Sequence, residues 1–290
     1  MSTTLSLQGV RGGVGVTTMS AALGHALHAQ GERVLLVECN PDHLLGLHLG
    51  LPAAEARGWA RAWLDGGDWR EAAFEAMPGL ALLPYGLAGD AEVAEVEERL
   101  RRSPRFWAER LPLLATQFDW ILFDLPQRLD AHVDAVNQHA ACALPLRLAT
   151  VDPGCHVLLQ RRPHDARRVL CNRYDPALAV QRDLMQLWID GGPPLVPQPL
   201  HEDANVAAAL ARKRPLGADA DGARRHKHNF MPGVPKIRQY THQITHALNV
   251  GPARLMRERG RSYFYDNTFC VFQHTIFSMI NKNYNRIIAL

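Results

Sequence analysis

Short apolar runs alternate with longer segments of helical periodicity along the first 217 residues. The runs predict strands, and their nearly unbroken hydrophobicity is typical of strands buried on both faces of a parallel sheet. The predicted strands cover residues 5–10, 33–38, 80–84, 119–124, 143–151 and 168–171. The predicted helices cover residues 17–30, 59–64, 91–115, 175–189 and 203–212. Because helices between parallel strands make crossover connections, the pattern predicts an α/β fold with a doubly wound, mostly parallel sheet flanked by helices.

The pattern changes near residue 217. Residues 261–290 hold seven of the 21 aromatic residues and show neither a helical period nor helix caps. We therefore divide the chain into a folded domain, residues 1–217, and a divergent basic, aromatic tail, residues 218–290, which we expect to be poorly ordered. A native extension that binds a partner or a membrane surface, a small folded domain, and a change of reading frame in the coding sequence are the competing explanations of the tail.

Composition and charge narrow the classes of protein. Hydrophobic residues make up 47% of the chain and charged residues 21%, which excludes wholesale disorder. The five cysteines do not form C-x-x-C pairs, so neither a disulfide scaffold nor a structural zinc site is predicted. The first 217 residues contain 21 Lys and Arg against 25 Asp and Glu, which argues against a protein that coats nucleic acid. We find neither a secretory signal nor an ordinary transmembrane pattern, and we expect a cytoplasmic protein.

The strongest local pattern is a glycine-rich turn between the first predicted strand and the first predicted helix, which reads QGVRGGVGVTT over residues 8–18. Glycines let backbone N–H groups converge on an anion, and the helix N-terminus adds its positive end. The predicted nucleotide-binding residues of this turn are Arg11, Gly12, Gly13, Val14, Gly15, Val16, Thr17 and Thr18. The Thr17 hydroxyl is expected to reach Mg²⁺. A dinucleotide-binding turn and a purely structural turn are the alternatives, but the third glycine of the dinucleotide fingerprint is absent.

The turn resembles the deviant phosphate loop of the ParA/MinD class of P-loop NTPases, whose pattern is KGGxGK[ST]T. Arg11 stands at its first lysine and Val16 at its second. The sequence GVRGGVGVTT is similar to the BcsQ family of bacterial cellulose biosynthesis, and so are the stretches GWARA, LDGGDWR and DWILFDLP. The resemblance covers about residues 5–217 and implies a ParA/MinD-like nucleotide-binding domain with ATP and Mg²⁺ as cofactors.

The resemblance also assigns roles outside the loop. Asp124 ends the run WILFD, where the class places the aspartate that reaches Mg²⁺; an aspartate that only caps the next turn is the alternative. Asn172 matches the asparagine on the adenine edge, although asparagine also favours turns. The resemblance places Pro199 in the loop that packs against adenine, with a simple proline-rich turn as the alternative. Asn40 stands where active ATPases of the class carry an acid, and with Val16 it implies slow or absent hydrolysis, so no catalytic residue is assigned.

The function implied by the resemblance is regulation of bacterial cellulose biosynthesis and secretion by a nucleotide-bridged homodimer. In such a dimer Arg11 would contact the other subunit's phosphates; an Arg11 that faces solvent at the edge of the loop is the alternative. The implied partners are BcsR-type and BcsE-type proteins and the inner-membrane cellulose synthase, which would recruit the chain to the inner membrane; no nucleic-acid partner is expected. The alternative is an active ParA/MinD-type ATPase in DNA partition or cell-division positioning, against which Val16, Asn40 and the acidic body argue.

Overall fold

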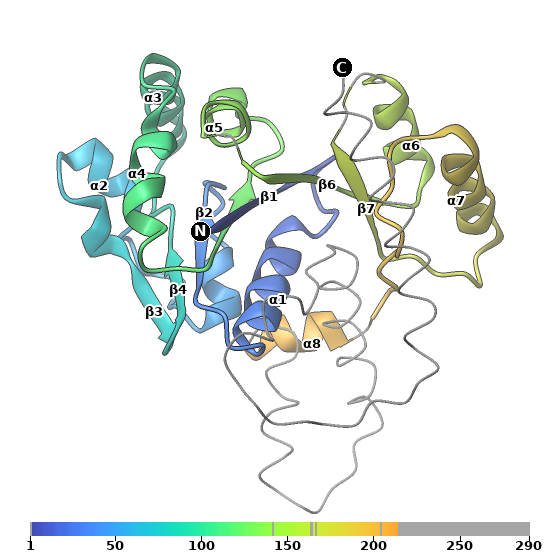
Figure 1. Ribbon diagram of the computed structural model, residues 1–290, viewed down its shortest axis with the longest axis horizontal. Helices are drawn as coiled ribbons and strands as arrows, with labels where there is room; N and C mark the ends of the chain where they lie inside the picture. Colours follow the sequence, from blue (N-terminus) through green and yellow to red (C-terminus); the bar gives the residue numbers. More distant parts are fainter. Residues whose placement is uncertain (1, 141, 163–164, 166, 204, 214–290) are drawn as a thin grey trace, which may run out of the picture. The chain divides into compact units, whose positions relative to one another are not determined.

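A seven-stranded sheet in the order β3-β4-β2-β5-β1-β6-β7 organises the computed structural model (Figure 1). The structure describes residues 2–140, 142–162, 165, 167–203 and 205–213. The strands are β1 (Thr3–Gly9), β2 (Val34–Glu38), β3 (Phe74–Met77), β4 (Leu80–Leu83), β5 (Trp120–Leu125), β6 (Leu144–Thr150) and β7 (Arg168–Asn172). Every neighbouring pair is parallel except β3 and β4, which are antiparallel. The predicted mostly parallel α/β sheet is therefore confirmed.

Helices connect the parallel strands and cover both faces of the sheet. They are α1 (Val16–His28), α2 (Trp59–Asp65), α3 (Asp90–Arg102), α4 (Phe106–Leu114), α5 (Asp130–Asp134), α6 (Pro153–Gln160), α7 (Ala179–Gly191) and α8 (Asn205–Ala211). A π-helical turn, Ala135–His139, follows α5 directly. In Figure 1, α3, α4 and α5 lie on one face and α1 and α8 on the other. No described helix is long and apolar enough to cross a membrane.

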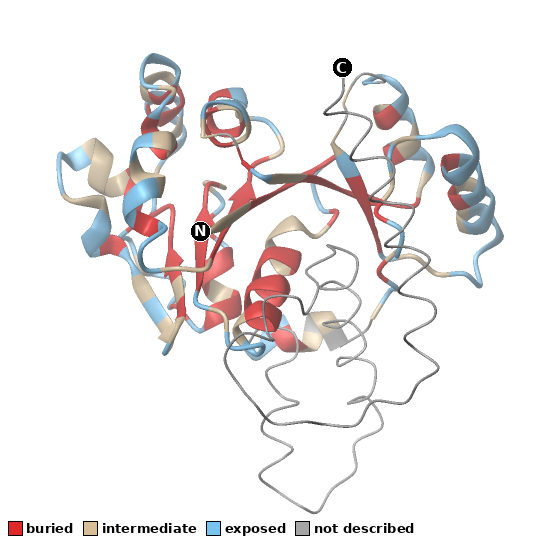
Figure 2. Cartoon of the chain, viewed as in Figure 1, coloured by how far each residue is buried: buried red, intermediate tan, exposed pale blue. Residues whose placement is uncertain are grey.

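Two apolar clusters fill the space between the sheet and its helices. Successive residues of a strand point to opposite faces, so Leu36 and Leu122 contact the cluster under α1, whereas Leu35 and Phe123 contact the cluster under α2 to α5. The central strands are accordingly buried over their whole length (Figure 2). This two-sided burial explains why the strands read as unbroken apolar runs.

The strand order reverses around β1. From β1 the chain crosses to β2 beyond β5, and it later returns from β5 past β1 to β6. In open α/β sheets, ligands bind outside the carboxyl ends of the strands at such a reversal point. The carboxyl ends of β1 and β5 are where the glycine-rich turn and Asp124 lie.

The helix predicted over residues 91–115 is wrong as a single element, because it is two helices, α3 and α4. Ser103 ends α3 with φ −125° and ψ 63°, outside the helical region, as expected for a residue that precedes a proline. The short strand β3 and the helices α5 and α6 were not predicted. The predicted tail, residues 218–290, lies outside the described residues.

Candidate functional site

The glycine-rich turn leaves β1 and enters α1 through left-handed backbone. Gly13 has φ +76° and Gly15, the N-cap of α1, has φ +97°. A Cβ atom at Gly15 would lie only 2.9 Å from Asn172 Nδ2, so glycine is required there both by conformation and by space. Gly12 and Gly13 are exposed, and the first turn of α1 carries no acidic residue. The turn therefore presents open backbone and the positive end of a helix to an anion.

Asp124 lies at the end of β5 between the neighbouring strands β1 and β2, where its cross-strand partners are Leu7 and Glu38. It is fully buried, and neither carboxylate oxygen has a hydrogen-bond partner among the described residues. Burial raises the pKa of the Asp124 carboxyl well above its ordinary value, and the charge of Glu38 raises it further. The nearby Thr17 hydroxyl lowers this pKa, but by less than burial raises it. A buried carboxylate without a partner is costly, and a hard cation would satisfy it.

Asp124 and Thr17 therefore fit Mg²⁺, which prefers oxygen ligands and takes few of them from protein. No cluster of three or more His, Cys, Asp or Glu side chains in the described part of the chain could hold a metal ion by itself. A cation beside Asp124 would thus need the Thr17 hydroxyl and oxygens from a ligand. That requirement agrees with a site for a metal–phosphate complex rather than for a free metal ion.

Val16 and Arg11 occupy the two lysine positions of the class and behave differently. The Val16 side chain packs against the apolar cluster under α1 and so supplies no charge to the turn. Arg11 donates from Nη2 to Asp152 Oδ2 at 2.9 Å and to Thr150 Oγ1 at 3.2 Å. Asp152 also caps α6 by accepting a hydrogen bond from the Cys155 amide. Arg11 is therefore held within its own chain, and a contact with another subunit would require it to leave Asp152.

Asn172 and Pro199 lie together beside the turn. Asn172 ends β7, is buried, and donates from Nδ2 to the Val14 carbonyl at 2.9 Å. The Leu200 amide donates to the Cys171 carbonyl at 2.8 Å, which places Pro199 next to the end of β7. The structure thus brings both residues to the phosphate-loop side of the sheet, with Asn172 fixing the loop itself. Their contact with adenine stays a prediction.

The loop after β2, which carries Asn40, is anchored by hydrogen bonds to the buried carboxylate of Glu38. Glu38 accepts hydrogen bonds from the Leu45 amide at 2.6 Å, the Tyr85 amide at 3.1 Å and His43 Nδ1 at 2.8 Å. His43 Nε2 lies 3.0 Å from the Glu55 carbonyl, so both ring nitrogens face acceptors and both must donate. The hydrogen bond to Glu38 raises the pKa of His43, although burial opposes the rise.

This anchoring was not evident in the sequence, where Glu38 only ended a predicted strand. The Asp152 cap was detectable, since an Asp-Pro pair after a strand is typical of a helix start. The contacts of Glu38 have no such local pattern, because they join segments that the fold brings together.

Comparison with known proteins gives a family match over the described domain. The family model of cellulose biosynthesis protein BcsQ matches residues 1–228. The cellulose biosynthesis protein BcsQ of Escherichia coli K12 is 38% identical over 223 residues, which cover 73% of this chain and 85% of that protein. Its counterpart from Salmonella typhimurium is 34% identical over 223 residues, with the same coverage.

Solved structures share the fold at lower identity. Cobyrinic acid a,c-diamide synthase from Mycobacterium smegmatis, with a bound ATP analogue and magnesium, matches with a TM-score of 0.57 and 22% identity, covering 80% of this chain and 99% of that chain. The septum site-determining protein MinD from Pyrococcus horikoshii, complexed with Mg-ADP, matches with a TM-score of 0.59 and 19% identity. The match covers 86% of this chain and 98% of that chain. The predicted P-loop NTPase architecture of the ParA/MinD type is therefore confirmed.

Proposed function

Since the chain belongs to the BcsQ family of cellulose biosynthesis proteins, we propose that it is a regulator of bacterial cellulose production that binds ATP with Mg²⁺ at residues 11–18. The observation that carries this proposal is the unpartnered, fully buried carboxylate of Asp124 beside a glycine-rich turn with open backbone. A Mg–nucleotide complex supplies both the cation that Asp124 lacks and the anion that the turn accommodates.

Different residues hold the phosphates, the Mg²⁺ ion and the base of the ligand. Backbone N–H groups from Gly12 to Thr18 face the phosphates, and the Thr17 hydroxyl and Asp124 hold Mg²⁺. Bound Mg²⁺ neutralises phosphate charge and links the nucleotide to β5. Asn172 and Pro199 lie on the side of the base. That the MinD structure which shares this fold is a complex with Mg-ADP supports the choice of ligand.

ATP serves mainly as a structural ligand in this proposal, and its hydrolysis is slow or absent. The Val16 side chain is turned into the apolar cluster and Asn40 is neutral, so the site lacks a cation and an acid that stabilise charge or orient water in active relatives. Binding produces a homodimer in this proposal. In it, Arg11 leaves its ion pair with Asp152 and contacts the phosphates bound to the other subunit. A guanidinium suits two phosphate oxygens because of its planar fork.

Membership of the BcsQ family supports the choice of partners. BcsR-type and BcsE-type proteins and the inner-membrane cellulose synthase are the expected partners, and they would bring the protein from the cytoplasm to the inner membrane. A DNA-partition ATPase is not favoured, because that function needs hydrolysis and a basic surface, whereas the first 217 residues are net acidic.

The test is binding of a fluorescent ATP analogue to the full chain, with and without Mg²⁺, combined with mass measurement by light scattering. We expect Mg²⁺-dependent binding and a doubled mass in ATP, both lost in Thr17→Ala and Asp124→Asn. Thr116→Ala is the matched control, since Thr116 is an exposed threonine just after α4 whose hydroxyl donates to the Leu113 carbonyl in the preceding turn. Folded wild-type protein that binds no ATP at millimolar concentration would contradict the proposal.

A further inference from the structure

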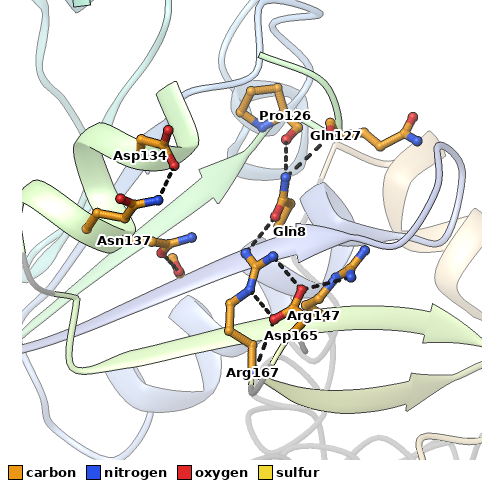
Figure 3. Close-up of polar contacts among 10 residues, drawn as sticks. Gln8, Pro126, Gln127, Asp134, Asn137, Arg147, Asp165 and Arg167 are labelled. Atoms are coloured by element: carbon orange, nitrogen blue, oxygen red, sulfur yellow. Dashed lines mark hydrogen bonds and ion pairs between the residues drawn. The ribbon is translucent and has the colours of Figure 1, made fainter. Parts of the chain in front are cut away.

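Gln8, the residue before the last of β1, is a buried amide at the start of the glycine-rich turn (Figure 3). Its Nε2 donates to the carbonyls of Pro126 and Gln127, at 3.4 and 3.3 Å. Its Oε1 accepts a hydrogen bond from Arg167 Nη1 at 2.7 Å. One side chain thus joins β1, the segment after Asp124 and the start of β7.

The orientation of this amide is fixed by its partners. A guanidinium can only donate and a backbone carbonyl can only accept, so Oε1 must face Arg167 and Nε2 must face the two carbonyls. Neither a carboxylate nor an apolar side chain of the same length can make both sets of contacts. Glutamine is therefore a specific requirement at position 8 and not simply a polar residue.

Arg167 is itself held in place by an ionic cluster in which Arg147 is buried and Asp165 and Arg167 are partly buried. Its Nε and Nη2 atoms lie 2.9 and 2.7 Å from the two oxygens of Asp165, in a bidentate pair. Asp165 Oδ2 also accepts a hydrogen bond from Arg147 Nη1 at 2.9 Å, and Arg147 on β6 is only 2% exposed. The Arg147–Asp165–Arg167 cluster, visible below Gln8 in Figure 3, thus anchors the guanidinium that orients Gln8.

The segment that Gln8 holds faces the phosphate loop. Gln127 comes three residues after Asp124, and its Oε1 would lie 3.7 Å from a Cβ atom at Gly12. The Gln127 side chain therefore lies beside the exposed backbone of Gly12, whose carbonyl also accepts a hydrogen bond from Arg11 Nη1 at 3.1 Å. A displacement of the backbone at residues 126–127 would therefore change the polar surface that meets the phosphates.

We propose that Gln8 is a positioning residue of the nucleotide site, which holds the backbone of residues 126–127 so that Gln127 contacts the bound phosphates. The Arg147–Asp165–Arg167 cluster sets the orientation of Gln8 and so takes part in the site without touching the ligand. This inference rests on the proposed function, because it assigns Gln127 a ligand in the phosphate loop. It adds two residues to the site: Gln127, which contacts the nucleotide, and Gln8, which acts by positioning Gln127.

The test uses the full chain and the release rate of a fluorescent ATP–Mg²⁺ analogue, followed by stopped flow. Gln8→Glu keeps an acceptor for Arg167 but turns a carboxylate oxygen toward two carbonyls, so we expect release to accelerate about ten-fold, as for a lost hydrogen bond. Gln127→Ala should accelerate release by a similar factor, and the double variant should be no faster than either single variant, since both act on one contact. Gln138→Ala, which removes an exposed amide in the π-helical turn that donates to Asp134 Oδ1, should release at the wild-type rate.

Hydrogen exchange of residues 126–129 in the nucleotide-free protein gives a second readout. Gln8→Glu and Gln8→Met should exchange faster there than wild type, whereas Gln127→Ala should not. Unchanged release and unchanged exchange in a folded Gln8→Glu variant would overturn the positioning role, and so would additive effects in the double variant. If wild type binds no ATP, the proposed function fails, and the role of Gln8 toward a nucleotide is overturned with it even where exchange shows that Gln8 holds the segment.

Discussion

The face of the sheet toward α5 has two halves of opposite chemistry. Over β4, β2 and β5 lies an aromatic half, formed by Trp59, Tyr85, Phe106, Trp107 and Phe123. Over β1 and β6 lies a polar half, formed by Ser6, Gln8, Arg147, Asp165 and Arg167. The register places them on one face, because Ser6 is the cross-strand partner of Phe123 and Gln8 is the partner of Arg147.

The two halves stabilise the fold by different means. Apolar burial is strong and non-directional, so the aromatic half supplies stability without fixing orientation. Hydrogen bonds and ion pairs contribute little net free energy when complete but cost much when one partner is lost, so the polar half fixes geometry. The polar half lies next to the phosphate loop, where geometry decides what a ligand meets. The comparison predicts that substitutions in the two halves differ in size and in kind.

The largest effect is expected from Trp107→Ala in the aromatic half. Trp107 is fully buried and contacts Trp59, Phe106 and Phe123. The cavity and the lost transfer free energy should lower the free energy of unfolding by about 3–5 kcal/mol in denaturant titrations. Trp107→Phe should cost far less, because the indole N–H has no partner among the described residues. A small effect of Trp107→Ala would contradict the claim that the aromatic half supplies the stability of the fold.

In the polar half, Asp165→Asn should destabilise the fold by about 3 kcal/mol, because it leaves the buried Arg147 and the partly buried Arg167 as mutually repelling cations without their shared carboxylate. Arg147→Met should cost less than about 1 kcal/mol, since Asp165 keeps Arg167 and one repulsion is removed. Burial opposes ionisation of Asp165, but Arg167 lowers its pKa from 3.8 to about 2. The ionised Asp165 carboxylate should therefore stabilise the fold fully above about pH 4, and this stabilisation should be lost as the pH falls toward 2. Equal costs of the two substitutions would contradict this account.

One polar anchor beside the aromatic half should titrate near neutral pH. The hydrogen bond to Glu38 raises the pKa of His43 above 6.5, so its contribution should be complete below pH 6.5 and be lost as the pH rises through the folded-state pKa. We expect wild type to lose about 1 kcal/mol of unfolding free energy between about pH 6 and pH 9, relative to His43→Asn. Asparagine suits the variant because it tolerates the left-handed backbone at φ 52°. Parallel pH profiles of the two proteins would exclude His43 as the titrating group.

The same contrast explains what could be predicted from the sequence. The strands other than β3 were predicted because hydrophobic runs are local patterns, and the glycine-rich turn was predicted from its glycine spacing. The role of Asp124 was implied by the resemblance to the ParA/MinD class and stays a prediction. The polar half was not, since Gln8 and Arg167 are 159 positions apart and neither lies in a pattern that indicates pairing. The break between α3 and α4 was missed because the helical charge pattern continues across Ser103, although Pro104 disfavours a helix there. Local chemistry predicted where a ligand could bind, whereas the contacts that orient the site depend on the register of the sheet.

The smallest and most discriminating test removes one hydroxyl from each half. Ser6 Oγ donates to Asn137 Oδ1 at 2.6 Å and ties the π-helical turn to β1, so Ser6→Ala should lower the free energy of unfolding by about 1 kcal/mol. The Tyr85 hydroxyl is buried without a hydrogen-bond partner in the described part of the chain, and burial raises its pKa. Tyr85→Phe should therefore change stability by less than about 0.5 kcal/mol or increase it, because no hydrogen bond is lost and an unsatisfied group is removed. If Tyr85→Phe costs as much as Ser6→Ala in paired denaturant titrations, the aromatic half also depends on specific polar contacts, and the division between the two halves fails.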